Sequence, residues 1–159
     1  MTGNTHIVGG IAASLAYAQY ANHDPILMLG AGVIGALLPD ICHSGSKIGR
    51  KLPLLSKSVN KVFGHRTFTH SLVFLVMIAV LLNAFVPNEA LKAGFLVGMA
   101  SHYVLDMATK KGIKLLFPLR MTVRFPVTTK TGSKIESIVF GILVLLSFYF
   151  GYGALGFYL

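Results

Sequence analysis

Charged residues are scarce in this chain, and acidic ones are the scarcest. Only 12% of the 159 residues are charged, against roughly 25% in an average soluble domain. Tryptophan is absent, and the one cysteine excludes an internal disulfide. Hydrophobic residues instead make up 54% of the chain. This composition excludes an ordinary soluble domain and predicts a single membrane-embedded domain over residues 1–159.

Five apolar segments predict an all-α, polytopic membrane bundle. They run over about 6–21, 26–40, 70–86, 90–108 and 136–158. The first two hold about 15 residues each, or roughly 22 Å of helix, less than the roughly 30 Å of the hydrocarbon core. We therefore expect about five transmembrane or partly inserted helices. Residues 2–6 carry no lysine or arginine, so the first segment is expected to be retained rather than cleaved as a signal peptide.

Two loops hold thirteen of the fourteen basic residues. These are Lys47, Arg50, Lys51, Lys57, Lys61 and Arg66 in the first loop, and Lys110, Lys111, Lys114, Arg120, Arg124, Lys130 and Lys134 in the second. The positive-inside rule places both loops and the N-terminus in the cytoplasm and, with five spans, the C-terminus outside. The stretch from Leu115 to Lys134 alternates apolar and basic residues and is expected to lie on the membrane surface near anionic head groups.

Ionisable residues mark the segment ends that this topology places on the cytoplasmic side. The set is His6, Asp40, His65, His70, His102 and Asp106. Such groups are costly in or near a bilayer and are functional candidates by default. Buried neutral imidazoles and carboxyls would gain only hydrogen bonds, whereas a bound cation offsets carboxylate charge. His6, Asp40, His70, His102 and Asp106 therefore predict a metal site on one side of the membrane.

The helical register supports this prediction. Residues four apart share a helix face, so Gly94 and Gly98 lie on the stripe that ends in His102 and Asp106. A second stripe is formed by Gly32, Ala36 and Asp40. Because small residues let helices approach closely, each stripe predicts tight helix packing along its length. The metal ligands follow at the end of each stripe.

His65 and His70 are five apart, about 140° around an ideal helix, so they cannot share a face if both are helical. Thr67 or Thr69 is expected to be the N-cap, with His65 in the loop and His70 in the first turn. His23, on the outer turn, is interpreted as an interfacial bystander. For His43 the sequence allows three roles: metal ligand, proton shuttle or solvated loop residue.

Three motifs resemble, in the same order, the YdjM-like (DUF457) family of bacterial inner-membrane proteins. They are Leu38-Pro39-Asp40-Ile41, His65-Arg66-Thr67-Phe68-Thr69-His70-Ser71 and Ser101-His102-Tyr103-Val104-Leu105-Asp106. The resemblance implies a membrane-bound metal-dependent hydrolase in the inner membrane, more distantly similar to zinc phospholipase C and zinc nucleases. Where the family commonly shows Asp-Ile-Asp-His, this chain has Asp40-Ile41-Cys42-His43. Either that position is not an essential ligand, or Cys42 replaces the carboxylate as a thiolate, which would favour zinc.

The resulting hypothesis is hydrolysis of a phosphoester on a lipid or lipid-linked substrate at the cytoplasmic leaflet. One or two Zn²⁺-like ions would be held by His6, Asp40, His65, His70, His102 and Asp106. Arg66 is assigned as a phosphate-binding cation, and Glu136 as an added ligand or general base. An acid at the start of a helix also favours the helix dipole, which would explain Glu136 without a catalytic role.

Two other function classes compete with hydrolysis. A metal carrier or transporter would place polar residues at the midplane or on both sides of the membrane, whereas the outer halves here are nearly free of ligands. A scaffold that tethers DNA would use the basic loops, but these lack interleaved aromatic residues and the positive-inside rule already explains them. No nucleic-acid partner is therefore expected.

Overall fold

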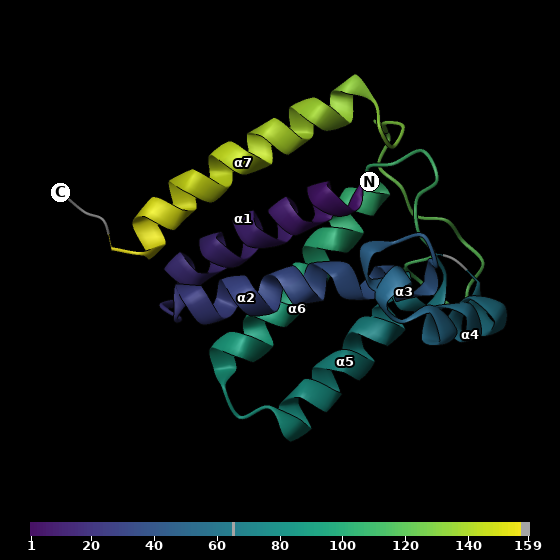
Figure 1. Ribbon diagram of the computed structural model, residues 1–159, viewed down its shortest axis with the longest axis horizontal. Coiled ribbons are helices and arrows are strands. Elements are labelled where there is room, and N and C mark those ends of the chain that lie inside the picture. Colours follow the sequence, from purple (N-terminus) through teal and green to yellow (C-terminus); the bar gives the residue numbers. More distant parts are fainter. Residues whose placement is uncertain (65, 157–159) are drawn as a thin grey trace.

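The computed structural model describes residues 1–64 and 66–156, and its regular elements are all helical (Figure 1). The five apolar segments form α1 (Gly3–Ala21), α2 (Pro25–Leu37), α5 (Leu72–Phe85), α6 (Glu89–Met107) and α7 (Lys134–Ala154). Two further α-helices and two 3-10 helices complete the described residues, which contain no β-strand. The predicted all-α class is confirmed.

Helix boundaries follow from local capping chemistry. The Asp24 carboxylate accepts hydrogen bonds from the backbone of Ile26 and Leu27 at the start of α2, where Pro25 occupies the first helical position. Ser133 plays the same part for α7 by accepting from the Glu136 backbone N–H. These side chains satisfy backbone donors that a helix start would otherwise leave without partners.

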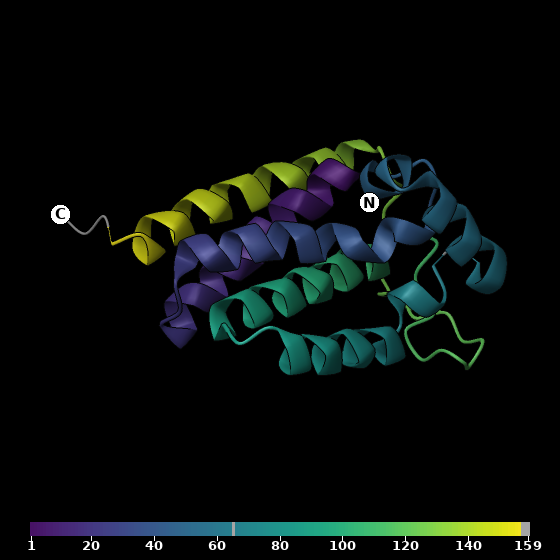
Figure 2. The ribbon, with the colours of Figure 1, turned by 60° about the horizontal axis from the view of Figure 1, so that its bottom comes forward.

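Close packing of α1, α2 and α6 forms the centre of the bundle, with α7 lying along α1 and α5 beside α6 (Figures 1 and 2). A Cβ atom added to Gly98 of α6 would lie 2.1 Å from the carbonyl oxygen of Gly32 on α2, and one added to Gly94 would lie 2.5 Å from that of Met28. The glycine stripes therefore bring two helix backbones into contact, as the sequence predicted.

Two described segments are long and apolar enough to cross a membrane. They are Pro25–Cys42, with 18 residues, and Lys134–Ala154, with 21. Helix α5 is apolar but has only 14 residues, about 21 Å at 1.5 Å per residue. The prediction of five spans is therefore not confirmed, although all five segments are helices.

The structure corrects two sequence predictions. The stretch between the second and third apolar segments was predicted as a basic loop, but it contains α3 (Lys47–Lys51) and α4 (Pro53–Phe63). Helix α5 begins after its N-cap Ser71, so neither Thr67 nor Thr69 caps this helix, although Thr67 occupies the N-cap position of the preceding 3-10 helix. His70 ends the 3-10 helix η2 (Phe68–His70) instead of lying in the first turn of α5.

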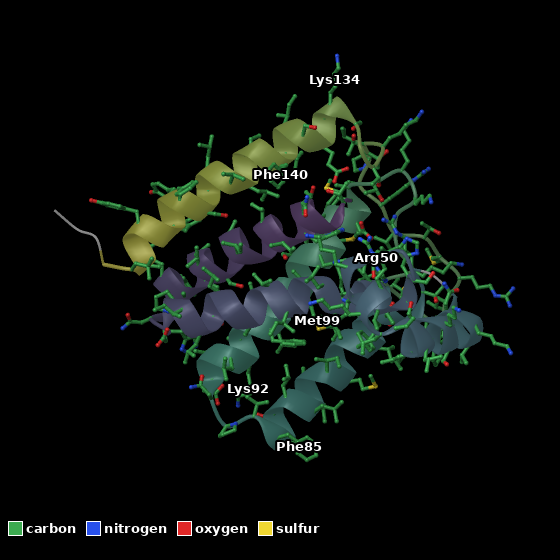
Figure 3. The ribbon with its side chains drawn as sticks, in the orientation of Figure 1. Arg50, Phe85, Lys92, Met99, Lys134 and Phe140 are labelled. Atoms are coloured by element: carbon green, nitrogen blue, oxygen red, sulfur yellow. The ribbon has the colours of Figure 1, made fainter. Side chains whose placement is uncertain are left out.

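Polar structure gathers at one end of the bundle. Helices α3 and α4, the N-terminus and the irregular chain between α6 and α7 lie there, whereas the last described residues lie at the opposite end (Figures 1 and 2). Many nitrogen-bearing side chains project from this polar end in Figure 3. The 3-10 helix η1 (Leu38–Cys42) extends α2 into it. The stretch from Leu115 to Ser133 is irregular, and isolated bridges pair its Val123 with Ile113 and its Thr129 with Thr109.

Candidate metal centre

Five of the six predicted metal ligands converge at the polar end of the bundle. His6 comes from the first turns of α1, Asp40 from η1, His70 from η2, and His102 and Asp106 from α6. Four of these side chains are at most 1% exposed, and that of Asp40 is 16% exposed. The sixth, His65, lies outside the described residues. Four separate elements thus supply one buried cluster, which we call the His–Asp cluster.

Short distances connect the members of the cluster. The Nε2 atoms of His70 and His102 are 3.2 Å apart. His102 Nε2 lies 3.7 Å from Asp106 Oδ2 and 3.8 Å from Asp40 Oδ1, while His6 Nε2 lies 3.3 Å from Asp106 Oδ1. Two ring nitrogens bound at 2.0–2.1 Å to one tetrahedral zinc ion would be about 3.3 Å apart. The His70–His102 separation therefore fits two ligands of one ion.

His102 is held in the tautomer that a ligand requires. Its Nδ1 atom lies 2.7 Å from the carbonyl oxygen of Ala36, which can only accept a hydrogen bond. Nδ1 must therefore carry the proton and donate it, so the lone pair of the neutral ring is on Nε2, which points into the cluster. A backbone carbonyl that orients a histidine in this way is the usual outer partner of a metal ligand.

Several buried polar atoms of the cluster lack hydrogen-bond partners within the described part of the chain. They are both ring nitrogens of His6 and Oδ2 of Asp106. An unsatisfied buried polar atom costs roughly 1–3 kcal/mol, and more when it is charged. His6 Nε2 lies 3.3 Å from Asp106 Oδ1, and Asp106 Oδ2 lies 3.5 Å from His70 Nε2, so these atoms belong to a donor set that fits a cation.

Electrostatics at His70 also favours positive charge. Burial lowers the pKa of this imidazole, but the carboxylates of Asp106 and Asp40 outweigh burial and raise it to about 10. The same two carboxylates would attract a metal ion, which takes the place of the proton on a histidine ligand.

Two overlapping groups have the spacing of metal ligands among the described residues. His6, Asp40 and His102 form one, and His70, His102 and Asp106 form the other, with all ligand atoms of a group within 4.8 Å of one another. His102 belongs to both groups. The arrangement can therefore hold one ion with His102 Nε2 as a ligand. A second ion would take its ligands from the other four residues, because His102 Nδ1 is committed to the Ala36 carbonyl.

Arg66 completes the charge balance of Asp106. Its Nη2 donates to Asp106 Oδ1 at 2.9 Å, and its Nη1 donates to the hydroxyl of Thr109 at 2.9 Å. The amino group of Met1 lies 2.5 Å from the same carboxylate oxygen. Arg66 thus contacts the cluster directly, and its predicted role in binding phosphate stays a prediction.

Glu136 ties three segments together. Its carboxylate accepts from the Thr2 backbone at 2.5 Å, the Thr5 hydroxyl at 2.7 Å and the Gly132 backbone at 2.6 Å. These bonds fix the start of α1, and with it His6, against the start of α7. They give Glu136 a positioning role, while its roles as ligand or base stay predictions.

Replacing Glu136 by glutamine tests this positioning role. The glutamine NH₂ group would face one of the N–H or O–H donors that Glu136 now accepts from, so we expect the free energy of unfolding to fall by about 1–3 kcal/mol. Zinc content should stay within about twofold. Thermal unfolding and elemental analysis of the purified protein measure the two effects. Glu89→Gln is the matched control, because the Glu89 side chain is 71% exposed at the other end of the bundle. Unchanged stability together with lost hydrolysis would instead support a general base.

The cysteine contacts the cluster, because Cys42 hydrogen-bonds His70, while His23 and His43 are outside the two ligand groups. His23 packs near the Tyr17 ring at 6.3 Å, close to the α1–α2 turn and far along the chain from any cluster residue. Cys42 is buried, and its thiol donates to the Pro39 carbonyl at 3.6 Å. His43 is exposed and borders two pockets of about 420 and 310 Å³ that both reach Asp40. The two ligand groups within the described residues include none of these three side chains.

Sequence reasoning missed the residues that hold the ligands in place. Tyr103 donates its hydroxyl to the Thr69 and Ser71 carbonyls at 3.0 and 3.3 Å, which fixes η2 and His70 against α6. Asn60 of α4 donates to the Cys42 carbonyl at 2.8 Å and so holds η1. Tyr103 lies next to His102 in the chain, which is a weak signal, and no local pattern marked Asn60.

The fold and the cluster define a class: an all-helical protein with apolar segments able to cross a membrane and a buried His–Asp centre at one end of the bundle. The profile of a family described as YdjM inner membrane protein matches residues 1–158. This chain belongs to that family, as its motifs predicted.

Relatives extend over most of the chain. The uncharacterized protein YvsG of Bacillus subtilis is 53% identical over 152 residues, which cover 96% of this chain and 95% of the relative. Inner membrane protein YdjM of Escherichia coli is 35% identical over 153 residues, covering 87% and 77%. Inner membrane protein YbcI of Escherichia coli is 37% identical over 103 residues, covering 59% and 55%. No solved structure matches the chain. Its family makes this chain an inner membrane protein, and two described segments are long and apolar enough to cross a membrane.

Proposed function

We propose that this protein is a multi-pass, membrane-bound metal-dependent hydrolase that cleaves a phosphoester on a lipid or lipid-linked substrate. The observation that supports it most is the His–Asp cluster, in which buried ring nitrogens and a carboxylate oxygen lack partners within the described residues. Ligands of this kind suit zinc, and two overlapping groups leave room for one or two ions. When bound, such an ion lowers the pKa of a coordinated water toward roughly 7 and polarises a phosphoryl oxygen.

The chain's own residues would bind and orient the substrate. Asp40, the most accessible cluster residue, lies on the walls of both pockets, so substrate would approach from this side. Arg66 also lines the larger pocket and can donate to phosphoryl oxygens there while it holds Asp106. His43 is exposed and borders both pockets, so its imidazole would be the group that moves a proton to the leaving oxygen.

The proposed orientation places the cluster at the cytoplasmic face. The basic loops and the cluster share one end of the bundle, and basic loops face the cytoplasm in membrane proteins. Helices α1, α5 and α6 would join the two candidate spans in a five-helix membrane domain, with α5 crossing a locally thinner bilayer. Exposed apolar side chains on α5 and α7, such as Val80, Leu145 and Phe148, suit contact with lipid tails.

Membrane vesicles test metal, activity and orientation together. Inverted vesicles, which expose the cytoplasmic face, are expected to release phosphate or a phosphorylated head group from added lipid phosphoesters. Right-side-out vesicles should do so only after permeabilisation. Chelation should lower the rate by at least roughly 100-fold, because the ion supplies several kcal/mol of transition-state stabilisation, and added Zn²⁺ should restore it.

The matched control is His23→Ala, which removes a histidine outside the ligand groups. Its activity and zinc content should equal those of the unaltered protein. Hydrolysis that survived complete metal removal would contradict the proposal. Movement of zinc across sealed liposomes without any hydrolysis would point to a carrier instead.

A further inference from the structure

The larger pocket beside the His–Asp cluster carries an excess of positive charge. It encloses about 420 Å³, within the usual range for small-molecule sites. Arg66, Lys110, Lys111 and Lys130 line it, and Asp40 is the carboxylate among its described lining residues. Because Arg66 is paired with Asp106, the excess comes from three lysines against the Asp40 carboxylate, a net charge of +2, so the pocket suits a polyanion.

Hydrogen bonds between two loop segments bring these lysines to one rim. The Lys110 backbone N–H donates to the Thr129 carbonyl at 3.0 Å, and the Thr129 N–H donates to the Ala108 carbonyl at 2.9 Å. Arg124 adds a side-chain bond to the Lys110 carbonyl at 3.2 Å. Lys110 and Lys130 are twenty positions apart in the chain. These hydrogen bonds hold their backbones together, so both side chains border the same cavity.

The pocket lysines have no ion-pair partner among the residues that the structure describes. Asp106 pairs with Arg66 and Glu89 with Lys92, while Asp40 faces His70 and His102. Asp24 and Glu136 accept hydrogen bonds from backbone N–H groups. Arg66 can still donate to an anion in the pocket, but its charge is balanced by Asp106. Lys110, Lys111 and Lys130 consequently remain as the cations able to neutralise an incoming anion.

Membrane topology alone does not account for this convergence. The positive-inside rule requires basic residues in the loop but not that they surround one cavity. Arg120 and Lys134 belong to the same stretch of chain, are exposed, and lie outside the pocket. They satisfy the topological rule equally well, which makes them matched controls for the pocket lysines.

We infer that Lys110, Lys111 and Lys130 bind a second phosphoryl group of the substrate, so that the substrate carries a diphosphate or a comparable polyanion instead of a singly charged phosphodiester. The inference rests on the proposed function, in which the reacting phosphoryl group lies at the His–Asp cluster, and Asp40 is shared by cluster and pocket. Lysine ammonium groups and the Thr131 hydroxyl supply donors to the oxygens of the second group.

Calorimetric titration of inorganic pyrophosphate into the full chain tests the pocket directly. The protein is held in nanodiscs of neutral lipid, in buffer with chelator so that metal neither binds pyrophosphate nor permits turnover. We expect pyrophosphate to bind more tightly than inorganic phosphate. The double variant Lys110→Gln/Lys130→Gln should bind pyrophosphate at least about tenfold more weakly, because each charge-assisted bond contributes at this scale. Arg120→Gln/Lys134→Gln should stay within about twofold.

Equal affinity of the two double variants, or no preference for pyrophosphate over phosphate, would overturn the inference. The lipid source is decided by a second arm, in which a single-chain lipid diphosphate is placed in the nanodisc. Suppression of pyrophosphate binding by this lipid, but not by a phosphodiester lipid, supports a lipid-linked diphosphate. Unaffected binding would show that the pocket takes a soluble polyanion. None of these readouts depends on hydrolysis, so a failure of the proposed activity would remain distinguishable.

Discussion

Asp106→Asn is expected to abolish metal binding and to destabilise the fold by about 3–5 kcal/mol, the usual cost of removing one partner from a buried charge pair. Asp106 is fully buried, with Arg66 and His6 near one carboxylate oxygen and His70 near the other. A neutral amide would leave the guanidinium without its counter-charge. It would also replace an acceptor by a donor among donors. Thermal unfolding and zinc content of the purified protein measure the two effects.

Asp24→Asn is the control for this substitution. Asp24 caps α2 at the other end of the bundle, and asparagine caps helices about as well as aspartate. Its stability and zinc content should not change. If Asp106→Asn does not fold, Asp40→Asn provides the second test, because its 16% exposed side chain can be changed with a smaller effect on stability. Stoichiometric zinc in both cluster variants would show that these carboxylates are not ligands.

Gly98→Ala is expected to destabilise the protein by about 1–3 kcal/mol or more and to weaken metal binding at a distance. The new Cβ would lie 2.1 Å from the Gly32 carbonyl oxygen, and backbone cannot rotate away as a side chain can. Helices α2 and α6 would have to separate. Because His102 follows Gly98 by one turn, separation would lengthen the 3.8 Å distance from His102 Nε2 to Asp40 Oδ1. Zinc affinity and thermal unfolding measure the effect.

Gly30→Ala on α2 isolates the packing effect. A Cβ at Gly30 meets nothing within 4 Å, so the change brings only the helix propensity of alanine, worth up to about 1 kcal/mol in favour of folding. Equal behaviour of Gly98→Ala and Gly30→Ala would contradict backbone contact between α2 and α6. Normal zinc affinity in a destabilised Gly98→Ala would instead separate packing from the geometry of the cluster.

Local sequence patterns predicted the five long helices. They also predicted that the metal ligands lie together at one end of these helices. Apolar periodicity and capping residues act within a few positions, so they are readable without tertiary structure. The register of Gly98 and His102 was readable for the same reason. Helix α4 carried a readable signal too, since Leu55, Val59 and Val62 recur at helical spacing. Because lysines lie among these residues, the segment was predicted as a basic cytoplasmic loop.

The start of the third apolar helix could not be predicted. Thr67, Thr69 and Ser71 are all acceptable N-caps by residue type. The choice of Ser71 comes with bonds from a distant helix, in which Tyr103 donates to the carbonyls of Thr69 and Ser71. Contacts between residues more than 30 positions apart leave no periodic mark in the sequence.

The sequence by itself therefore determined the membrane class, the family, the helices and the set of chemically able residues at one end of the bundle. Tertiary structure decided which of them share a centre, that Glu136 fixes the start of α1, and that Lys110 and Lys130 border one pocket. The physical reason is range. Propensity, capping and helical register act over a few residues, whereas a site depends on distances between elements, which only the packing of the whole bundle sets.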